Sequence, residues 1–137
     1  MAAALFKELL RRSNLLDRYR VESAGTWAED GLPATTMAGQ AMAERGLDLS
    51  DHRSRRIRGE WMPGFDLVLV MEDGHREALQ IEFPDIADRV RLLAGMAGED
   101  ISIPDPVGGS IESYRALADE LADLLLRGLA HIRNAVE

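Results

Sequence analysis

The sequence predicts one α/β domain over residues 1–137, a three-layer fold in which helices cover both faces of a short parallel sheet. Helical patterns alternate along the chain with short apolar runs, which is typical of strands buried on both faces. The 137 residues are enough for one domain with a core of its own and too few for two ordinary domains. In such sheets, functional residues lie in the loops after the carboxyl ends of the strands.

Composition excludes several classes of function. The formal net charge of −8 argues against general binding to nucleic acid or to anionic membranes, which requires a basic surface. There is no cysteine, so disulfides, zinc–thiolate sites and thiol nucleophiles are excluded within these residues. The three histidines, His52, His75 and His131, have no metal-ligand spacing, and we expect neither a metal nor a cofactor. The sequence shows no signal peptide and no membrane-spanning run, so we expect a cytoplasmic protein.

In the first half of the chain we expect a helix over residues 2–12, because Ala, Leu, Lys, Glu and Arg all favour helices and the leucines fall on one face. Arg20–Ser23 predicts a short strand. Residues 35–45 predict a second helix that Gly46 ends. The segment Leu49–Arg58 is basic within an acidic protein; it could bind an anion, or it could be a solvated face that balances nearby carboxylates.

In the second half, Phe65–Met71 predicts a strand buried on both faces, since its apolar residues do not alternate with polar ones. Residues 73–82 predict a helix, and Val90–Leu93 a second buried strand. A long helix is expected over Ser110–Asn134, broken or softened at Gly128.

The segment Ile101–Tyr114 combines two prolines, a Gly-Gly pair and a carboxylate ahead of the long helix. Asp105 lies between Pro104 and Pro106, which stiffen the backbone on both sides of it. Ser110 can cap the helix. Taken alone, the segment could be a rigid connector with a solvated aspartate, but its place after the last strand is where catalytic residues are expected.

In their order along the chain, several segments together resemble the low-molecular-weight protein tyrosine/arginine phosphatases, above all the bacterial members. The arsenate reductases built on the same fold are a more distant match. The segments that carry the resemblance are Met1-Ala2 before ALFKELL, Val21–Thr26, His52–Arg55, Asp66–Met71, and Asp105–Ser110 with Tyr114.

The resemblance implies a two-step hydrolysis of phosphorylated proteins without a cofactor. A cysteine thiolate attacks phosphorus and forms a phosphocysteine, while loop amides and an arginine hold the phosphoryl oxygens. The aspartate of the Asp-Pro motif, here Asp105, protonates the leaving group and then activates water. Val107 corresponds to a position that often carries a slot-lining aromatic residue, and Trp27 falls in a loop that forms another wall of the substrate slot.

The sequence departs from this pattern at its start. The family's first strand and its Cys-x5-Arg loop precede a Ser-Pro-Met-Ala-Glu motif, whereas this sequence begins at the Met of that motif and has Ala3 in place of the glutamate. We therefore expect an N-terminally truncated family domain that is inactive as given. The gene product could be longer, or this could be a form without the nucleophile.

In the family's strand order, 2-1-3-4, the absent strand lies inside the sheet. Losing about four buried side chains at roughly 1.5–3 kcal/mol each would cost on the order of the stability of a whole domain. The sheet is therefore either rearranged or completed by a second chain, and we expect homo-oligomers that complete each other through exposed strand edges. The alternative to an inactive phosphatase domain is a non-catalytic module that self-associates or binds phosphate through Arg53 or Arg55. A different hydrolase pairing Asp105 with His52 or His75 is disfavoured, since the sequence shows no nucleophile, base and orienting group together.

Overall fold

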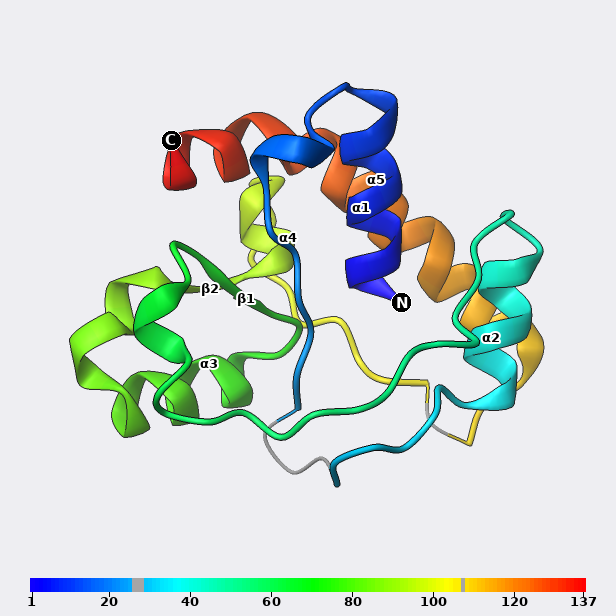
Figure 1. Ribbon diagram of the computed structural model, residues 1–137, viewed down its shortest axis with the longest axis horizontal. Coiled ribbons are helices and arrows are strands. Elements are labelled where there is room, and N and C mark those ends of the chain that lie inside the picture. The colour runs from blue at the N-terminus through cyan, green and yellow to red at the C-terminus, as the bar shows by residue number, and fades with distance from the viewer. Residues whose placement is uncertain (26–28, 107) are drawn as a thin grey trace. The chain divides into compact units, whose positions relative to one another are not determined.

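The computed structural model describes residues 1–25, 29–106 and 108–137. The chain forms two compact units. Unit 1 comprises Met1–Arg56 and Pro106–Asp123, and unit 2 comprises Ile57–Asp105 and Leu124–Glu137. Each unit is described by itself below, with the element labels of Figure 1.

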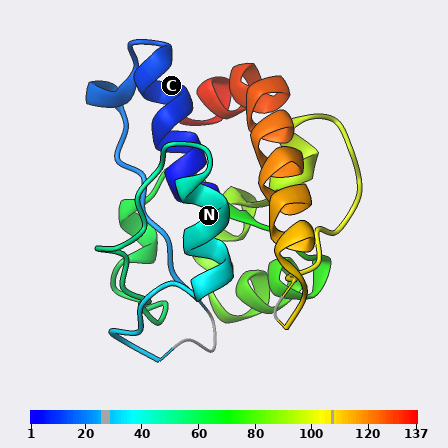
Figure 2. The same cartoon turned by 90° about the vertical axis from the view of Figure 1, so that its right-hand side faces the viewer.

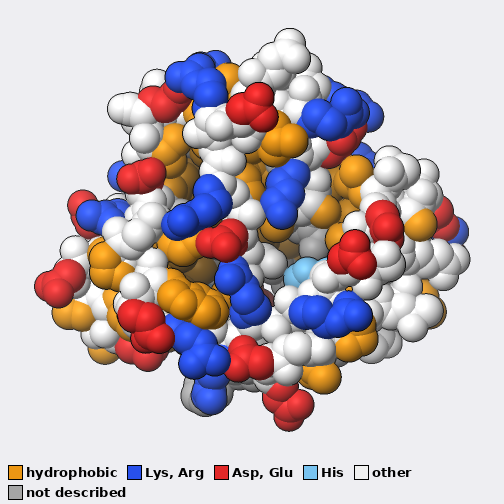
Figure 3. Space-filling model, viewed as in Figure 1, with side chains coloured by type: hydrophobic (Ala, Val, Ile, Leu, Met, Phe, Trp, Pro, Cys, Tyr) orange, Lys and Arg blue, Asp and Glu red, His pale blue; other side chains and the backbone are white. Residues whose placement is uncertain are grey.

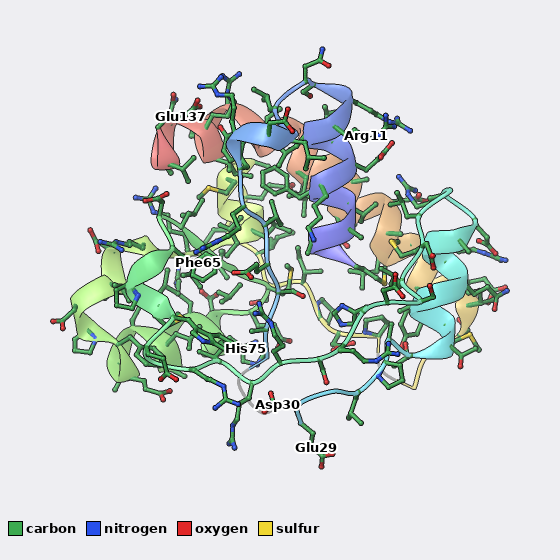
Figure 4. The ribbon with its side chains drawn as sticks, in the orientation of Figure 1. Arg11, Glu29, Asp30, Phe65, His75 and Glu137 are labelled. Carbon is green, nitrogen blue, oxygen red and sulfur yellow. The ribbon has the colours of Figure 1, made fainter. Side chains whose placement is uncertain are left out.

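Unit 1 begins with helix α1, Ala2–Arg12, which has the predicted bounds and buries Leu5 and Leu10. At its basic end the carboxylate of Glu8 pairs with Arg11 at 2.6 Å and with Arg12 at 2.9 Å. Figure 4 shows Arg11 on the outer side of this helix. A 3₁₀ turn, η1 (Leu16–Arg18), follows the helix.

Helix α2 of unit 1 spans Thr36–Ala43, shorter than the predicted 35–45 because Thr35 is its cap and accepts a hydrogen bond from the Ala38 N–H at 3.3 Å. Gly46 has the predicted role in ending the helix: its φ of +76° suits glycine best and turns the chain away. Ala41 and Met42 are the buried residues of the helix, so this methionine is a core residue as its apolar character suggests.

The predicted strand Arg20–Ser23 is wrong. In this region the described residues form only an isolated parallel bridge, Gly25 to Arg56, and Gly25 donates its N–H to the Arg55 carbonyl at 2.8 Å. A strand needs a run of ladder hydrogen bonds with a neighbouring strand. Among the described residues, backbone pairing occurs here at one position, so Arg20–Ser23 forms no strand.

The parallel sheet lies in unit 2, where strands β1 (Val68–Val70) and β2 (Val90–Leu92) run side by side in the register Val68–Val90 (Figure 1). Both strands are shorter than predicted. They also differ in burial. In β2 the two end residues are buried and the middle one, Arg91, is exposed, whereas all three residues of β1 are half-buried. The prediction that the first of these strands is buried on both faces is therefore wrong, because Val68, Leu69 and Val70 all stay half-exposed.

Along the chain, helices and 3₁₀ turns lie before, between and after these strands. They are η2 (Met62–Gly64), α3 (Asp73–Glu82, as predicted), η3 (Pro84–Arg89) and α4 (Leu93–Met96). One apolar cluster of unit 2 joins a residue from each of four elements, namely Met62, Leu79, Ile86 and Val90. The Arg89 guanidinium donates to the carbonyls of Pro63 and Phe65, at 3.2 and 3.1 Å, and so fixes the approach to β1, where Figure 4 shows Phe65.

Helix α5, Ile111–Val136, runs without a break, as Figure 2 shows. The predicted break at Gly128 is wrong, and packing gives the reason. A Cβ at this position would lie 2.8 Å from the Met96 Cβ and 3.0 Å from its carbonyl carbon. Gly128 is therefore present to let α4 approach the helix backbone.

Acidic and basic side chains are interspersed on the face drawn in Figure 3. Among the described residues, no helix combines the length and the apolar character needed to cross a bilayer.

Candidate active site

Asp105 ends a loop of unit 2 that is fastened to the carboxyl end of β1. The Ile103 N–H donates to the carbonyl of Met71, the residue after β1, at 2.8 Å. The Ile103 side chain is 2% exposed and anchors the loop in the core. Two residues further on, Asp105 is exposed to solvent. The structure thus ties the loop of Asp105 to the carboxyl end of a strand, which is the edge of α/β sheets where functional groups are expected.

The same loop contacts the first turn of α3. The Asp73 N–H donates to the hydroxyl oxygen of Ser102 at 3.1 Å. Glu72, which precedes the helix, makes no side-chain cap hydrogen bond. The Oδ1 atom of Asp73 lies 2.6 Å from the guanidinium of Arg76, so the two charges compensate each other. The same Oδ1 atom is buried and accepts no hydrogen bond of good geometry.

The turn that follows Asp105 belongs to unit 1 and uses both glycines of the Gly-Gly pair. Gly108 has a φ of +78°, which side chains other than glycine rarely adopt. Gly109 donates its N–H to the Pro106 carbonyl at 2.6 Å, and a Cβ on Gly109 would lie 2.7 Å from that same oxygen. The Ser110 hydroxyl accepts the Ser113 N–H at 3.3 Å, which confirms the predicted cap of the long helix.

Unit 1 brings together two of the motif segments, Val21–Thr26 and His52–Arg55. The Arg55 guanidinium donates to the Ser23 carbonyl at 3.2 and 3.4 Å and lies 3.6 Å from the Glu22 carboxylate. Arg53 donates to the carbonyls of Ser50 and His52 at 3.0 and 2.7 Å. Both arginines therefore have partners within the chain, which weakens the interpretation of this segment as a phosphate site.

The loop from Glu29 to Leu32 is fastened by hydrogen bonds that involve Ser54 and Asp30. The Ser54 hydroxyl donates to the Glu29 carbonyl and accepts the Leu32 N–H at 3.0 Å. The Asp30 carboxylate accepts the Arg56 N–H at 2.9 Å. Figure 4 shows Glu29 and Asp30 on this loop. Trp27 itself and Val107, the two predicted slot-lining residues, lie outside the described residues.

His52 has an altered acidity. Burial lowers the pKa of His52, and the positive charges of the chain's amino terminus, Arg53 and Lys7 lower it further. His75 lies on α3 (Figure 4), with its Nδ1 3.7 Å from the Glu72 carboxylate. No group of three acidic or histidine side chains among the described residues is placed to hold a metal ion.

The arrangement offers an exposed carboxylate on a stiff loop, which can donate and accept protons, but no cysteine thiol among the 137 residues. Reasoning from sequence missed Ser102 and Ser54, because each acts on a partner more than 20 residues away. Only the proximity of Ser102 to the Asp-Pro motif could have drawn attention to it.

Comparisons with known proteins agree with this architecture. The family model of the low molecular weight phosphotyrosine protein phosphatases matches residues 1–136. A protein-arginine-phosphatase of Geobacillus stearothermophilus is 36% identical over 128 residues, which cover 93% of this chain and 82% of that protein. A low molecular weight protein-tyrosine-phosphatase of Streptomyces coelicolor is 32% identical over 146 residues, which cover 100% of this chain and 87% of that protein. The structure of a low molecular weight protein tyrosine phosphatase from T. tengcongensis has a TM-score of 0.88 at 30% identity. The match covers 95% of this chain and 88% of that one.

Proposed function

This chain belongs to the low molecular weight phosphotyrosine protein phosphatase family, and we propose that it carries the acid/base half of that reaction. In this proposal Asp105 serves a phosphorylated protein substrate, with phosphotyrosine or phosphoarginine as the group attacked. The observation that carries it is the placement of Asp105 two residues after the Ile103 bond to the end of β1. The named relatives include both an arginine and a tyrosine phosphatase, so both substrate classes are retained.

In the first step a cysteine thiolate would form a bond to phosphorus while the bond from phosphorus to the leaving oxygen or nitrogen breaks. Asp105, protonated, would give its proton to the leaving group. In the second step the Asp105 carboxylate would take a proton from water as the water oxygen displaces the cysteine sulfur from phosphorus. A positioned acid of this kind contributes about 10²–10⁴-fold to the rate.

We propose that the 137 residues alone do not complete this reaction, because they contain no cysteine. A general acid has nothing to assist when covalent attack on phosphorus is absent. Hydrolysis of para-nitrophenyl phosphate by the chain should equal that of the Asp105→Asn variant and of buffer. Clear turnover that Asp105→Asn abolishes would overturn the claim of inactivity.

The role of Asp105 is tested separately by fusing a Cys-x5-Arg-Ser-Pro loop and a preceding strand in front of Met1. We expect turnover to appear in the fusion and to fall about 10²–10⁴-fold on Asp105→Asn. A matched control is Asp100→Asn, an exposed aspartate in the same unit. If Asp105→Asn and Asp100→Asn leave the same activity in an active fusion, Asp105 is not the acid.

A second proposal, self-association, is supported by the exposure of β1. Its residues Val68, Leu69 and Val70 are all half-buried, and the described sheet pairs this strand along one edge only. An unpaired apolar strand edge is a template for another strand, and two copies can pair about a two-fold axis. We therefore propose that a second copy of this chain is the partner.

Light scattering at micromolar concentration should give a dimeric or larger mass, and Leu69→Lys should lower it to that of one chain. Circular dichroism of the variant checks that it remains folded. A single-chain mass for the unmodified protein, together with a cooperative melt, would rule out self-association.

A further inference from the structure

Ser102 makes a contact that the proposed reaction does not yet explain. Its hydroxyl oxygen accepts the Asp73 N–H at 3.1 Å and so acts as the cap of α3 from 29 residues away. Helices usually take this cap from the residue that precedes them, but Glu72 makes no such hydrogen bond. Ser102 is exposed, so a place in the apolar core does not explain the residue.

A second hydrogen bond joins the same two segments. The Ile103 N–H donates to the Met71 carbonyl at 2.8 Å, one residue along from the Ser102 contact. A single hydrogen bond fixes the distance between two segments but lets them pivot. Two bonds at neighbouring residues, made to Met71 and Asp73, also fix the direction in which the loop leaves β1.

Little freedom remains between this double attachment and the acid. Only Pro104 separates Ile103 from Asp105, and its ring fixes its own φ. Pro106 in turn biases Asp105 toward an extended backbone. The direction set at Ser102 and Ile103 is therefore transmitted along the backbone to Asp105, where its side chain begins.

We propose that Ser102 is a positioning residue for Asp105, which it aims by capping α3. This inference rests on the proposed role of Asp105 as the acid. A displacement of about 1 Å in a catalytic group can cost on the order of 10²-fold in rate, so a family that uses this aspartate gains from a rigid attachment beside it. A residue with a side-chain acceptor is required at position 102, whereas a small side chain alone is not sufficient.

The test compares Ser102→Thr with Ser102→Val, which differ by a hydroxyl against a methyl group of similar size. The readouts are hydrogen exchange of the Ile103 amide and the carboxyl carbon-13 chemical shift of Asp105, both by NMR on the full 137-residue chain. We expect Ser102→Thr to match the unmodified protein. Ser102→Val should speed Ile103 exchange on the order of tenfold, the effect of losing one hydrogen bond, and should move the Asp105 signal. Ser102→Ala should behave like Ser102→Val, which excludes an effect of β-branching.

Asp73→Asn is the control for a merely structural role. It removes the charge at the first turn of α3 and the ion pair with Arg76, but it keeps the N–H that Ser102 accepts. We expect it to lower stability while leaving the Asp105 signal in place. The proposal fails if Asp73→Asn moves that signal as Ser102→Val does, or if Ser102→Val leaves both readouts unchanged. Neither readout needs turnover, so these outcomes are independent of the activity tests above.

Discussion

In unit 1, ion pairs join elements that are far apart in the sequence. Arg115 of α5 makes two bonds to the Glu44 carboxylate, at 2.6 and 2.8 Å, and Arg45 lies 2.7 Å from Asp119. Unit 2 also has a long-range ion pair, Arg127 with Glu99 at 3.0 Å, but it adds a parallel strand pair and an apolar cluster that joins four elements. Charged contacts at a surface depend on pH and salt, whereas apolar contacts depend on volume. Each kind of contact should therefore respond to its own perturbation, whichever unit contains it.

The largest effect is expected in β2. Leu92→Ala removes a side chain that is 3% exposed and should lower the free energy of unfolding by about 2–5 kcal/mol. The matched change in β1, Leu69→Ala, should cost less than half as much, because Leu69 is half-buried. Chemical denaturation measures both. Equal losses would show that the two strands are equally buried in solution, against the difference described here.

The next effect compares a helical glycine from each unit. Gly128→Ala in unit 2 should destabilise by about 1–3 kcal/mol, because the new Cβ would lie 2.8 Å from the Met96 Cβ. Gly39→Ala in α2 of unit 1 has no atom within 4 Å of its Cβ and should stabilise by up to about 1 kcal/mol through helix propensity. Thermal melts of the two variants should thus shift in opposite directions. A stabilising Gly128→Ala would refute the close approach of α4.

A pH effect is expected from His52 in unit 1. Its pKa is lowered in the folded protein, so between the folded value and the ordinary value of 6.5 the unfolded chain binds more protons. Stability should then rise with pH through this window and be lost as pH falls below 6.5. His52→Gln should flatten this slope, as measured by denaturation at several pH values. An imidazole that titrates at or above 6.5 by NMR would contradict the prediction.

The smallest effect concerns the surface carboxylates of unit 1. Hydrogen bonds from Arg11 and Arg12 lower the pKa of Glu8 from 4.5 to about 2. A carboxylate whose pKa is lowered in the folded protein contributes stability that is fully present above pH 4.5. This stability is lost as the pH falls from 4.5 toward 2. Glu8→Gln should make this loss shallower, and added salt should reduce the difference since the group is exposed. Identical acid melts of the two proteins at low salt would exclude the effect.

Local sequence predicted the features that depend on neighbouring residues. The bounds of α1 and α3 agree with the predicted helices because propensity and apolar spacing act within a few turns. Thr35, Gly46 and Ser110 end or begin helices by contacts within four residues. Asp105 could be singled out because the prolines that stiffen it are adjacent.

Long-range features could not be predicted in this way. Arg20–Ser23 has a strand-like pattern, but a strand forms only with a backbone partner, and among the described residues of this region the backbone bridge is at Gly25. A glycine such as Gly128 weakens an isolated helix, yet here its lack of a side chain leaves room for the close approach of α4. At such positions tertiary packing outweighs the local preference for helix or strand.

The sequence by itself determined the family motifs and the absence of a thiol in these residues, and through the resemblance it led to the proposal of Asp105 as the acid. Only the tertiary structure decided that Arg53 and Arg55 are engaged by main-chain carbonyls, that β1 is half-exposed, and that Ser102 and Ile103 fasten the Asp105 loop. The physical reason is that residue chemistry is local, whereas hydrogen-bond partners and burial are set by segments that meet only in the folded chain.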